Sequence, residues 1–251
     1  LFCRRKRHTN PSFMKYIYGP VKSRRLGNSL GISIVPYKVC SFDCVYCQLK
    51  KTTKKTKQRK NYAPVAEILE EINNFFLNKP KDLKIDCVTF SGSGEPTLHC
   101  SIGALIRAVK ELTHLPVVLI TNSSTMVDPK VAGEIKDVDL IIPSLDAVTQ
   151  DVFEKIDSPI KGLRVEDVIE ALIKFRRTFK GKMWLEVMLV RGLNDSPEYL
   201  KKIKKAADMI KPDRVQLNAP IRPPAQNWVK PTSSSTLKKA KEIFGENCDI
   251  V

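Results

Sequence analysis

The sequence predicts an α/β protein built as a partial (βα)6 barrel of the TIM type, with parallel strands inside and helices outside. Roughly six short apolar segments alternate with stretches whose apolar residues recur every three or four positions. This is the pattern of buried parallel strands alternating with amphipathic helices. A length of 251 residues suits one large core. Six units are too few for a closed eight-fold barrel, so we expect one open side.

The expected strands are short segments made almost wholly of apolar residues, except for the first, which also contains Ser and Gly. They cover residues 29–35, 87–90, 117–120, 140–142, 184–190 and 215–217. The expected helices cover residues 64–78, 102–112, 129–135, 165–175, 200–210 and 235–244, and Pro64 suits a first helical position. Residues 220–231 contain four prolines and are expected to be extended.

Three regions are expected along the chain. Residues 1–13 are rich in Arg and Lys and lack the apolar stretch of a secretory signal. They do not begin with Met, and the well-patterned sequence opens at Met14, so we expect them to be upstream read-through. A basic arm that binds nucleic acid is the alternative for this segment. Residues 14–220 should form the core domain. Residues 221–251 should form a C-terminal extension, which could be truncated at Val251.

The composition favours a cytoplasmic protein that meets polyanions. No apolar run approaches the ~18 residues of a membrane span, so we expect no membrane association. The seven cysteines do not resemble a disulfide framework, and they fit a reducing compartment. The net charge of +16 attracts RNA, DNA or acidic surfaces, although a well-solvated lysine-rich surface would explain it equally.

The basic residues are concentrated just after one cysteine cluster. Residues 50–60 contain seven Lys or Arg and no acid, and they begin three residues after Cys47. The run lacks the interleaved aromatic residues that would indicate base stacking. Its position favours a loop that contacts a polyanion such as RNA beside the cysteine cluster, and a solvated loop is the alternative.

Three cysteines share one short loop. Cys40, Cys44 and Cys47 have the spacing C-x3-C-x2-C, which allows their thiolates to converge on one metal centre. A cubane iron–sulfur cluster normally takes four cysteines, so three would leave one iron open to a small molecule. A zinc site would need a fourth Cys or His nearby. Three unrelated buried thiols are the remaining alternative.

A glycine-rich loop follows the second expected strand. In the segment Ser-Gly-Ser-Gly-Glu-Pro-Thr, Gly92 and Gly94 allow a ligand to approach the backbone, and Glu95 could accept a bond from a cationic amine. The segment is not a phosphate-binding P-loop, because no Gly-Lys-Ser/Thr follows. An ordinary turn is the alternative.

Polar residues also follow the later strands. Asn122, Ser144 and Asp146 suit ribose hydroxyls or an amino-acid carboxylate, although such residues are also common in turns. Glu186 lies within an apolar strand and should face the barrel interior, where it would bind a ligand or balance a buried Lys or Arg. Since loops after parallel strands meet at one end of a barrel, these groups should converge with the cysteine loop.

Together these motifs resemble a known superfamily. Cys40, Cys44 and Cys47, with Tyr46 before the last cysteine, resemble the signature of the radical S-adenosylmethionine (SAM) superfamily. Residues 19–27, 91–97, 143–147 and 222–225 are similar to a group of iron–sulfur oxidoreductases related to the wyosine-type tRNA base synthases. The resemblance covers about residues 14–244.

The resemblance implies cofactors and site residues. Cys40, Cys44 and Cys47 would hold a [4Fe-4S] cluster, whose open iron would take the amino and carboxylate groups of SAM, and SAM cleavage would yield a 5′-deoxyadenosyl radical. The residues expected to contact SAM are Tyr46 near adenine, Gly92, Gly94 and Glu95 near methionine, and Asn122, Ser144, Asp146 and Glu186. The resemblance identifies no catalytic residue.

The resemblance also implies partners. We expect an enzyme that modifies a base in RNA such as tRNA, an electron donor such as flavodoxin or ferredoxin, and a monomer. Upstream of the motif only Cys3 could serve a second cluster, which does not support tRNA base synthesis proper. The alternatives are a radical activase or peptide-modifying enzyme, and a non-catalytic iron–sulfur redox sensor that binds nucleic acid.

Overall fold

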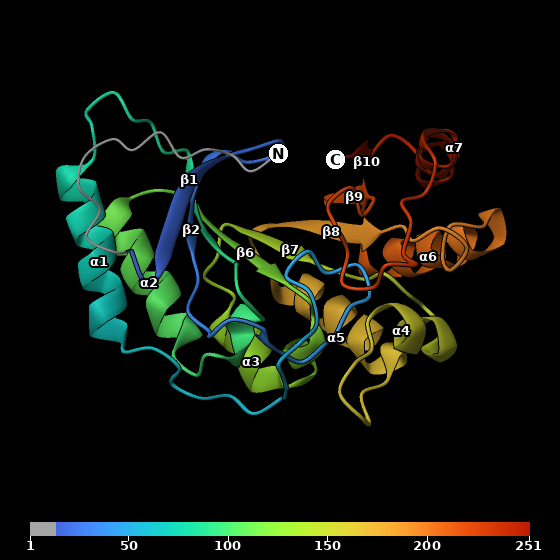
Figure 1. Cartoon of the computed structure of the whole chain (residues 1–251), viewed down its shortest axis with the longest axis horizontal. Helices are drawn as coiled ribbons and strands as arrows, with labels where there is room; N and C mark the ends of the chain where they lie inside the picture. The colour runs from blue at the N-terminus through green and yellow to red at the C-terminus, as the bar shows by residue number, and fades with distance from the viewer. Residues whose placement is uncertain (1–13) are drawn as a thin grey trace.

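One curved sheet with helices packed on its outer face forms the protein (Figure 1). The structure is a computed structural model and describes residues 14–251. The expectations for residues 1–13 and for Cys3 therefore lie outside the described residues. The strand order is β1-β2-β5-β6-β7-β8-β9-β10. The strands are β1 (Ile17–Ser23), β2 (Gly27–Ile32), β5 (Cys87–Phe90), β6 (Val117–Thr121), β7 (Leu140–Pro143), β8 (Lys182–Met188), β9 (Arg214–Asn218) and β10 (Cys248–Ile250).

The six predicted strands are confirmed as a parallel sheet. Strands β2, β5, β6, β7, β8 and β9 each pair in parallel with the next, which gives the predicted partial α/β barrel. Two edge strands were not predicted. Strand β1 is antiparallel to β2 and is interrupted by Gly19-Pro20, so its sequence lacks an apolar run. Strand β10 has three residues and pairs in parallel with β9.

The helices follow the predicted pattern with local differences. They are α1 (Val65–Asn78), α2 (Ile102–Thr113), α3 (Pro129–Glu134), α4 (Gln150–Ile156), α5 (Val165–Thr178), α6 (Pro197–Ile210) and α7 (Ser234–Phe244), with 3-10 turns η1 (Pro96–Leu98) and η2 (Ser124–Val127). Pro64 caps α1 in an extended conformation, so helix 64–78 begins one residue later than predicted. Helix α4 was not predicted because its seven residues are too few to show a periodic pattern.

The two faces of the sheet differ in character. The main apolar core lies between the sheet and the helices. A smaller apolar cluster covers the early residues of the strands on the concave face and includes Cys87, Val118, Leu140 and Trp184. Polar side chains such as Thr89 follow later along the same face. The apolar cluster thus closes one end of the concave face, and the functional candidates lie towards the other.

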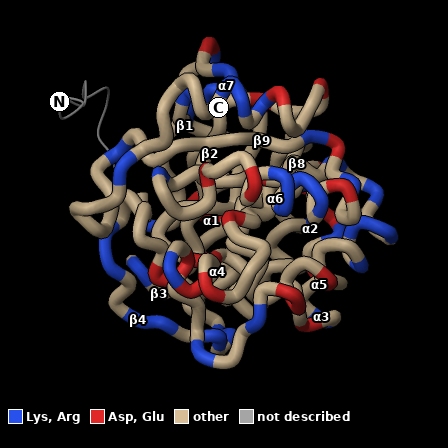
Figure 2. Tube along the Cα trace, turned by 90° about the vertical axis from the view of Figure 1, so that its right-hand side faces the viewer, with Lys and Arg blue, Asp and Glu red and all other residues tan. Residues whose placement is uncertain are grey.

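The basic run is partly ordered as a strand. Residues Lys54–Lys55 form β4, which pairs in parallel with β3 (Val39–Cys40) at the start of the cysteine motif. The predicted loop 50–60 therefore contains a two-residue strand against the cysteine loop. Figure 2 shows Lys and Arg along β4, whereas Asp and Glu gather over α4. Within residues 14–251, no helix has the length and apolar character needed to cross a membrane.

Candidate functional site

Backbone hydrogen bonds fix the cysteine loop against the end of α4. The Asp43 amide donates to Asp157 O (3.0 Å) and the Val45 amide to Ile156 O (2.9 Å). The Phe42 ring packs edge-on against Phe153, with 5.3 Å between ring centroids. The loop is therefore held by main-chain contacts that do not depend on its cysteine side chains.

Each thiol meets a polar group from a different part of the chain. The side-chain nitrogen Nδ2 of Asn122 lies 3.4 Å from Cys40 Sγ, and Nζ of the buried Lys38 lies 3.2 Å from Cys47 Sγ. Cys44 Sγ lies 3.5 Å from Asp157 Oδ1. Burial, followed by the charge of Glu95, raises the pKa of Cys40 to about 11. Because a thiol must lose its proton to bind a metal, metal binding here would release protons.

The donor set suits an iron–sulfur cluster better than a single ion. Among residues 14–251, no three Cys, His, Asp or Glu side chains lie close enough together to hold a single metal ion. A [4Fe-4S] cluster places each cysteine on a separate iron, so its ligands need not share one ion. Burial, followed by the charge of Asp157, raises the pKa of Cys44. Ligation by Cys40, Cys44 and Cys47 remains a prediction.

The glycine-rich loop lies directly beside the cysteine loop. The Lys38 amide donates to Ser93 O (2.6 Å), and the Glu95 amide donates to Val39 O (3.1 Å). A Cβ at Gly94 would lie 2.0 Å from Val39 O, so this contact excludes every side chain. Gly92 has a φ of +114°, which glycine adopts far more readily than other residues. Both glycines are therefore explained by local geometry, and their contact with SAM remains a prediction.

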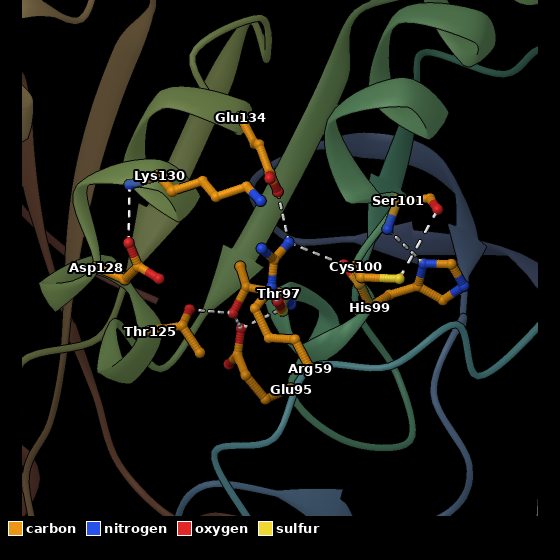
Figure 3. Close-up of polar contacts among 10 residues, drawn as sticks. All are labelled: Arg59, Glu95, Thr97, His99, Cys100, Ser101, Thr125, Asp128, Lys130 and Glu134. Carbon is orange, nitrogen blue, oxygen red and sulfur yellow. Dashed lines mark hydrogen bonds and ion pairs between the residues drawn. The ribbon is translucent and has the colours of Figure 1, made fainter.

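Glu95 links two neighbouring strand-end loops, and Figure 3 shows its bonds to Thr97 in the first of them. One carboxylate oxygen accepts bonds from the Thr97 amide (3.1 Å), Thr97 Oγ1 (2.6 Å) and Thr121 Oγ1 (2.7 Å). The other carboxylate oxygen accepts a bond from the backbone amide of Asn122 (2.8 Å). Burial raises the pKa of Glu95, and these bonds oppose the rise. Glu95 thus positions the Asn122 loop, and its predicted contact with an amine is untested.

Tyr46 and Asp146 come together although they are 100 residues apart. The Tyr46 hydroxyl donates to Asp146, which also accepts from the Met188 amide (2.8 Å). Burial raises the pKa of Asp146 to about 6. The buried Asn194 side chain donates to Asp146 O and Met188 O, each at 2.8 Å. Sequence reasoning missed Asn194 because an Asn in a polar loop gives no signal of burial.

Glu186 forms an ion pair with Arg25 across the concave face. Arg25 also donates to Gln216 Oε1 (2.6 Å). Of the two roles that the sequence left open for Glu186, the structure shows the balancing of a largely buried arginine. The predicted contact between Glu186 and a cofactor is untested. Ser144 lies half-buried beside this pair, and its backbone carbonyl accepts a bond from Ser123 Oγ (2.9 Å).

One member of the basic run has a structural role. Arg59 donates to Thr97 O (2.9 Å) and His99 O (3.1 Å), and it forms an ion pair with Glu134 at 2.5 Å (Figure 3). These contacts fasten the end of the run to η1 and α3. Arg59 is therefore not part of a freely accessible basic surface.

Arg59→Met should destabilise the protein by about 3 kcal/mol, because two carbonyls and one carboxylate lose a charged donor. For a chain of this size, the midpoint of thermal unfolding should fall by about 6–12 °C. The matched control is Lys57→Met at an exposed position of the same run, which should change stability by less than about 0.5 kcal/mol. Equal melting temperatures for the two variants would contradict this role for Arg59.

Comparison with known proteins identifies relatives of this site. The family model described as Radical SAM superfamily matches residues 34–203. The chain is 34% identical to UPF0026 protein MJ1312 of Methanocaldococcus jannaschii over 93% of this chain and 72% of that protein. It is 43% identical to a Brachyspira hyodysenteriae protein named GTPase Obg over 94% of this chain, but spans only 34% of that protein. A name given to a protein about three times as long assigns no activity to this chain.

More distant matches come from RNA-modifying and other radical SAM proteins. The probable dual-specificity RNA methyltransferase RlmN of Thermotoga sp. is 26% identical over 83% of this chain and 59% of that protein. A radical SAM methyltransferase from Sphaerobacter thermophilus has a TM-score of 0.70 at 14% identity, covering 89% of this chain and 65% of that one. SuiB of Streptococcus suis, solved bound to S-adenosylmethionine, has a TM-score of 0.64 at 16% identity, and the match covers 88% of this chain and 49% of SuiB. The structural matches support the predicted fold.

Proposed function

Because the chain belongs to the radical SAM superfamily and to the UPF0026 proteins, and is therefore an enzyme, we propose that it uses a [4Fe-4S] cluster and SAM to modify a base in RNA. One observation carries the cofactor part of this proposal. Loops that follow β2, β5 and β6 meet around the thiols, through the Lys38–Ser93 and Glu95–Val39 backbone bonds and the Asn122 contact with Cys40.

The cysteine loop would hold the cluster. In this proposal Cys40, Cys44 and Cys47 would hold the cluster, and an iron without a cysteine ligand would be open to SAM. When bound, the two cofactors supply reductive cleavage of SAM to methionine and a 5′-deoxyadenosyl radical that abstracts a hydrogen atom from the substrate. The electron would come from a donor such as flavodoxin or ferredoxin.

The surrounding side chains would orient and stabilise these groups. Lys38 Nζ and the side-chain nitrogen Nδ2 of Asn122 are placed to donate hydrogen bonds to the sulfurs that would bind the cluster. Such bonds offset the negative charge of the sulfurs. The Tyr46 ring, which is fixed by its bond to Asp146, would contact adenine. Gly94 lets the loop after β5 approach the cysteine loop closely enough for both to contact one cofactor.

Two observations favour RNA as the substrate. The net charge of +16 attracts a polyanion, and the basic residues of β4 lie against the cysteine motif. Among the relatives found by sequence, RlmN of Thermotoga sp. is named as an RNA methyltransferase. A radical activase, a peptide-modifying enzyme and a non-catalytic redox sensor are distinguishable outcomes of the following test.

The anaerobically reconstituted protein should convert SAM to 5′-deoxyadenosine when dithionite replaces the electron donor. With RNA extracted from cells grown in heavy water, mass spectrometry should find deuterium in the 5′-deoxyadenosine, because the radical takes its hydrogen from the substrate. The protein fraction of the same cells, treated to remove RNA, is the parallel sample.

The outcomes separate the competing functions. Deuterium from the protein fraction but not from RNA would identify a radical activase or peptide-modifying enzyme. Intact SAM after long incubation, with cluster loading confirmed by iron and sulfide analysis, would contradict radical chemistry and favour the redox sensor.

A further inference from the structure

Residues 1–42 contain no acidic residue, and two later segments of the chain also lack them. Between Asp43 and Glu67 there are seven Lys or Arg and no Asp or Glu. Between Asp213 and Glu242 there are six Lys or Arg and again no acid. The segments are far apart in the sequence, so only the fold can show whether their charges act together.

The fold places parts of the two segments side by side. The Gln226 amide donates to Val45 O (3.0 Å), and Lys50 Nζ donates to Pro224 O (3.1 Å). Arg222 and Gln48 are joined by a further side-chain hydrogen bond. Figure 1 shows the loop after β9 running beside the cysteine loop. The proline-rich stretch 220–231 therefore borders the candidate site.

Two exposed aromatic residues accompany these contacts: Tyr37 precedes the segment 44–66, and Trp228 lies within the segment 214–241. Tyr37 is 57% exposed and Trp228 is 55% exposed. The Tyr37 hydroxyl donates to Leu49 O (2.6 Å), which holds the ring beside Lys50. The backbone at Trp228 is anchored by the next residue, the buried Val229. The fold thus supplies the aromatic residues that the basic run itself lacks.

The cations around these rings are available for phosphates. Lys50, Lys51, Arg222 and Lys230 are all exposed. Within the part of the chain that the structure describes, none of the four has a carboxylate partner within 4.0 Å. Arg59 and Arg214, by contrast, are neutralised by Glu134 and Asp249 and are not counted with them.

We propose that Tyr37, Lys50, Lys51, Arg222, Trp228 and Lys230 form one RNA-binding surface, here called the Tyr37–Trp228 platform. The inference rests on the proposed function and assigns its substrate class as RNA with unpaired bases. Bases stack on the two rings, and phosphates contact the four cations. The platform borders the cysteine loop and holds the RNA next to the site of radical formation.

The chemistry of the platform favours unpaired RNA over other polyanions. An acidic protein or a duplex would be attracted by the four cations but would gain little from the rings. Exposed aromatic rings instead bind bases that are free to leave a helical stack. Two rings flanked by uncompensated cations therefore point to a loop or single strand of RNA.

The test is binding of the reconstituted full chain to a labelled single-stranded RNA of about 12 nucleotides, followed by fluorescence anisotropy over a range of salt concentrations. Tyr37→Ala and Trp228→Ala should each weaken binding about tenfold with the salt dependence preserved, whereas Trp228→Phe should keep most of the affinity. Combined replacement of Lys50, Lys51, Arg222 and Lys230 by Gln should reduce the slope of log K against log salt by about 0.7 for each lost phosphate contact.

The control charges lie at the opposite end of the parallel strands. Lys136 and Lys180 are exposed and precede β7 and β8, so Lys136→Gln with Lys180→Gln should leave RNA affinity nearly unchanged. A duplex of the same sequence should bind more weakly than the single strand and should be insensitive to the aromatic variants. Thermal unfolding of each variant establishes that it is folded.

Unchanged single-strand affinity in the folded Tyr37→Ala and Trp228→Ala variants would overturn the platform. The platform would also be overturned if polyglutamate bound as tightly as RNA and the charge variant lost both activities. That result would indicate an acidic protein partner. Wild-type SAM cleavage without RNA is measured separately. The platform and the proposed cofactor chemistry can therefore fail independently.

Discussion

Cys44→Ser is expected to abolish formation of 5′-deoxyadenosine, with a fall of more than about 100-fold in the anaerobic assay. Loss of an outer-sphere partner typically lowers metal affinity or activity by about 10–100-fold, and loss of a ligand should exceed that. Cys44 is the middle ligand of the proposed set, and its backbone carbonyl accepts a bond from the Cys47 amide (3.1 Å). The fold should survive, because the loop is held by backbone bonds at Asp43 and Val45.

The matched control is Cys100→Ser. Cys100 is an exposed free cysteine outside the proposed ligand set. The control should retain wild-type iron content, the visible absorbance of the cluster and SAM cleavage. If Cys44→Ser retained a full cluster and full cleavage, Cys44 would not be a ligand.

Gly94→Ala is expected to destabilise the protein by about 3 kcal/mol, because its new methyl group would lie 2.0 Å from Val39 O. The obstacle is backbone at the start of the cysteine motif, so it cannot rotate away as a side chain would. We expect the midpoint of thermal unfolding to fall by about 6–12 °C. Cluster incorporation during reconstitution should fall as well, since the two loops can no longer lie side by side.

Gly133→Ala provides the comparison for a glycine with space around it. No atom lies within 4 Å of a Cβ built at Gly133 in α3, and alanine is the better helix former there. Its stability should stay equal or rise by up to about 1 kcal/mol. A melting temperature for Gly94→Ala within the range of this control would show that the cysteine and glycine loops tolerate separation.

The sequence was informative about the fold where burial leaves a plain pattern. Strand β6 lies in the middle of a parallel sheet and is recognisable as the continuous apolar run Val117–Ile120. The edge strands β1 and β10 are exposed on one side and contain Pro20 and Asp249, so neither shows such a run. Their pairing depends on partners that only the folded sheet supplies.

The sequence likewise predicted only part of the candidate site. Motif spacing located Cys40, Cys44, Cys47 and the Gly94–Glu95 loop, because those residues are close in sequence as well as in space. It could not reveal that Tyr46 bonds to Asp146 or that Arg25 pairs with Glu186, since these pairs are separated by 100 and 161 residues. Short polar residues such as Asn194 carry no mark of burial, and only the structure shows their bonds.

The backbone bonds of the cysteine loop have a consequence for the affinity of the proposed cluster. Asp43 and Val45 are fixed to the end of α4, and Gln226 and Glu95 bond to the same loop from two other segments. Ordering a flexible loop costs about 1–2 kcal/mol of conformational entropy per residue. In this protein the loop is already ordered by folding, so binding of a cluster need not order the chain as zinc does in a zinc finger. More of the binding free energy then remains as affinity.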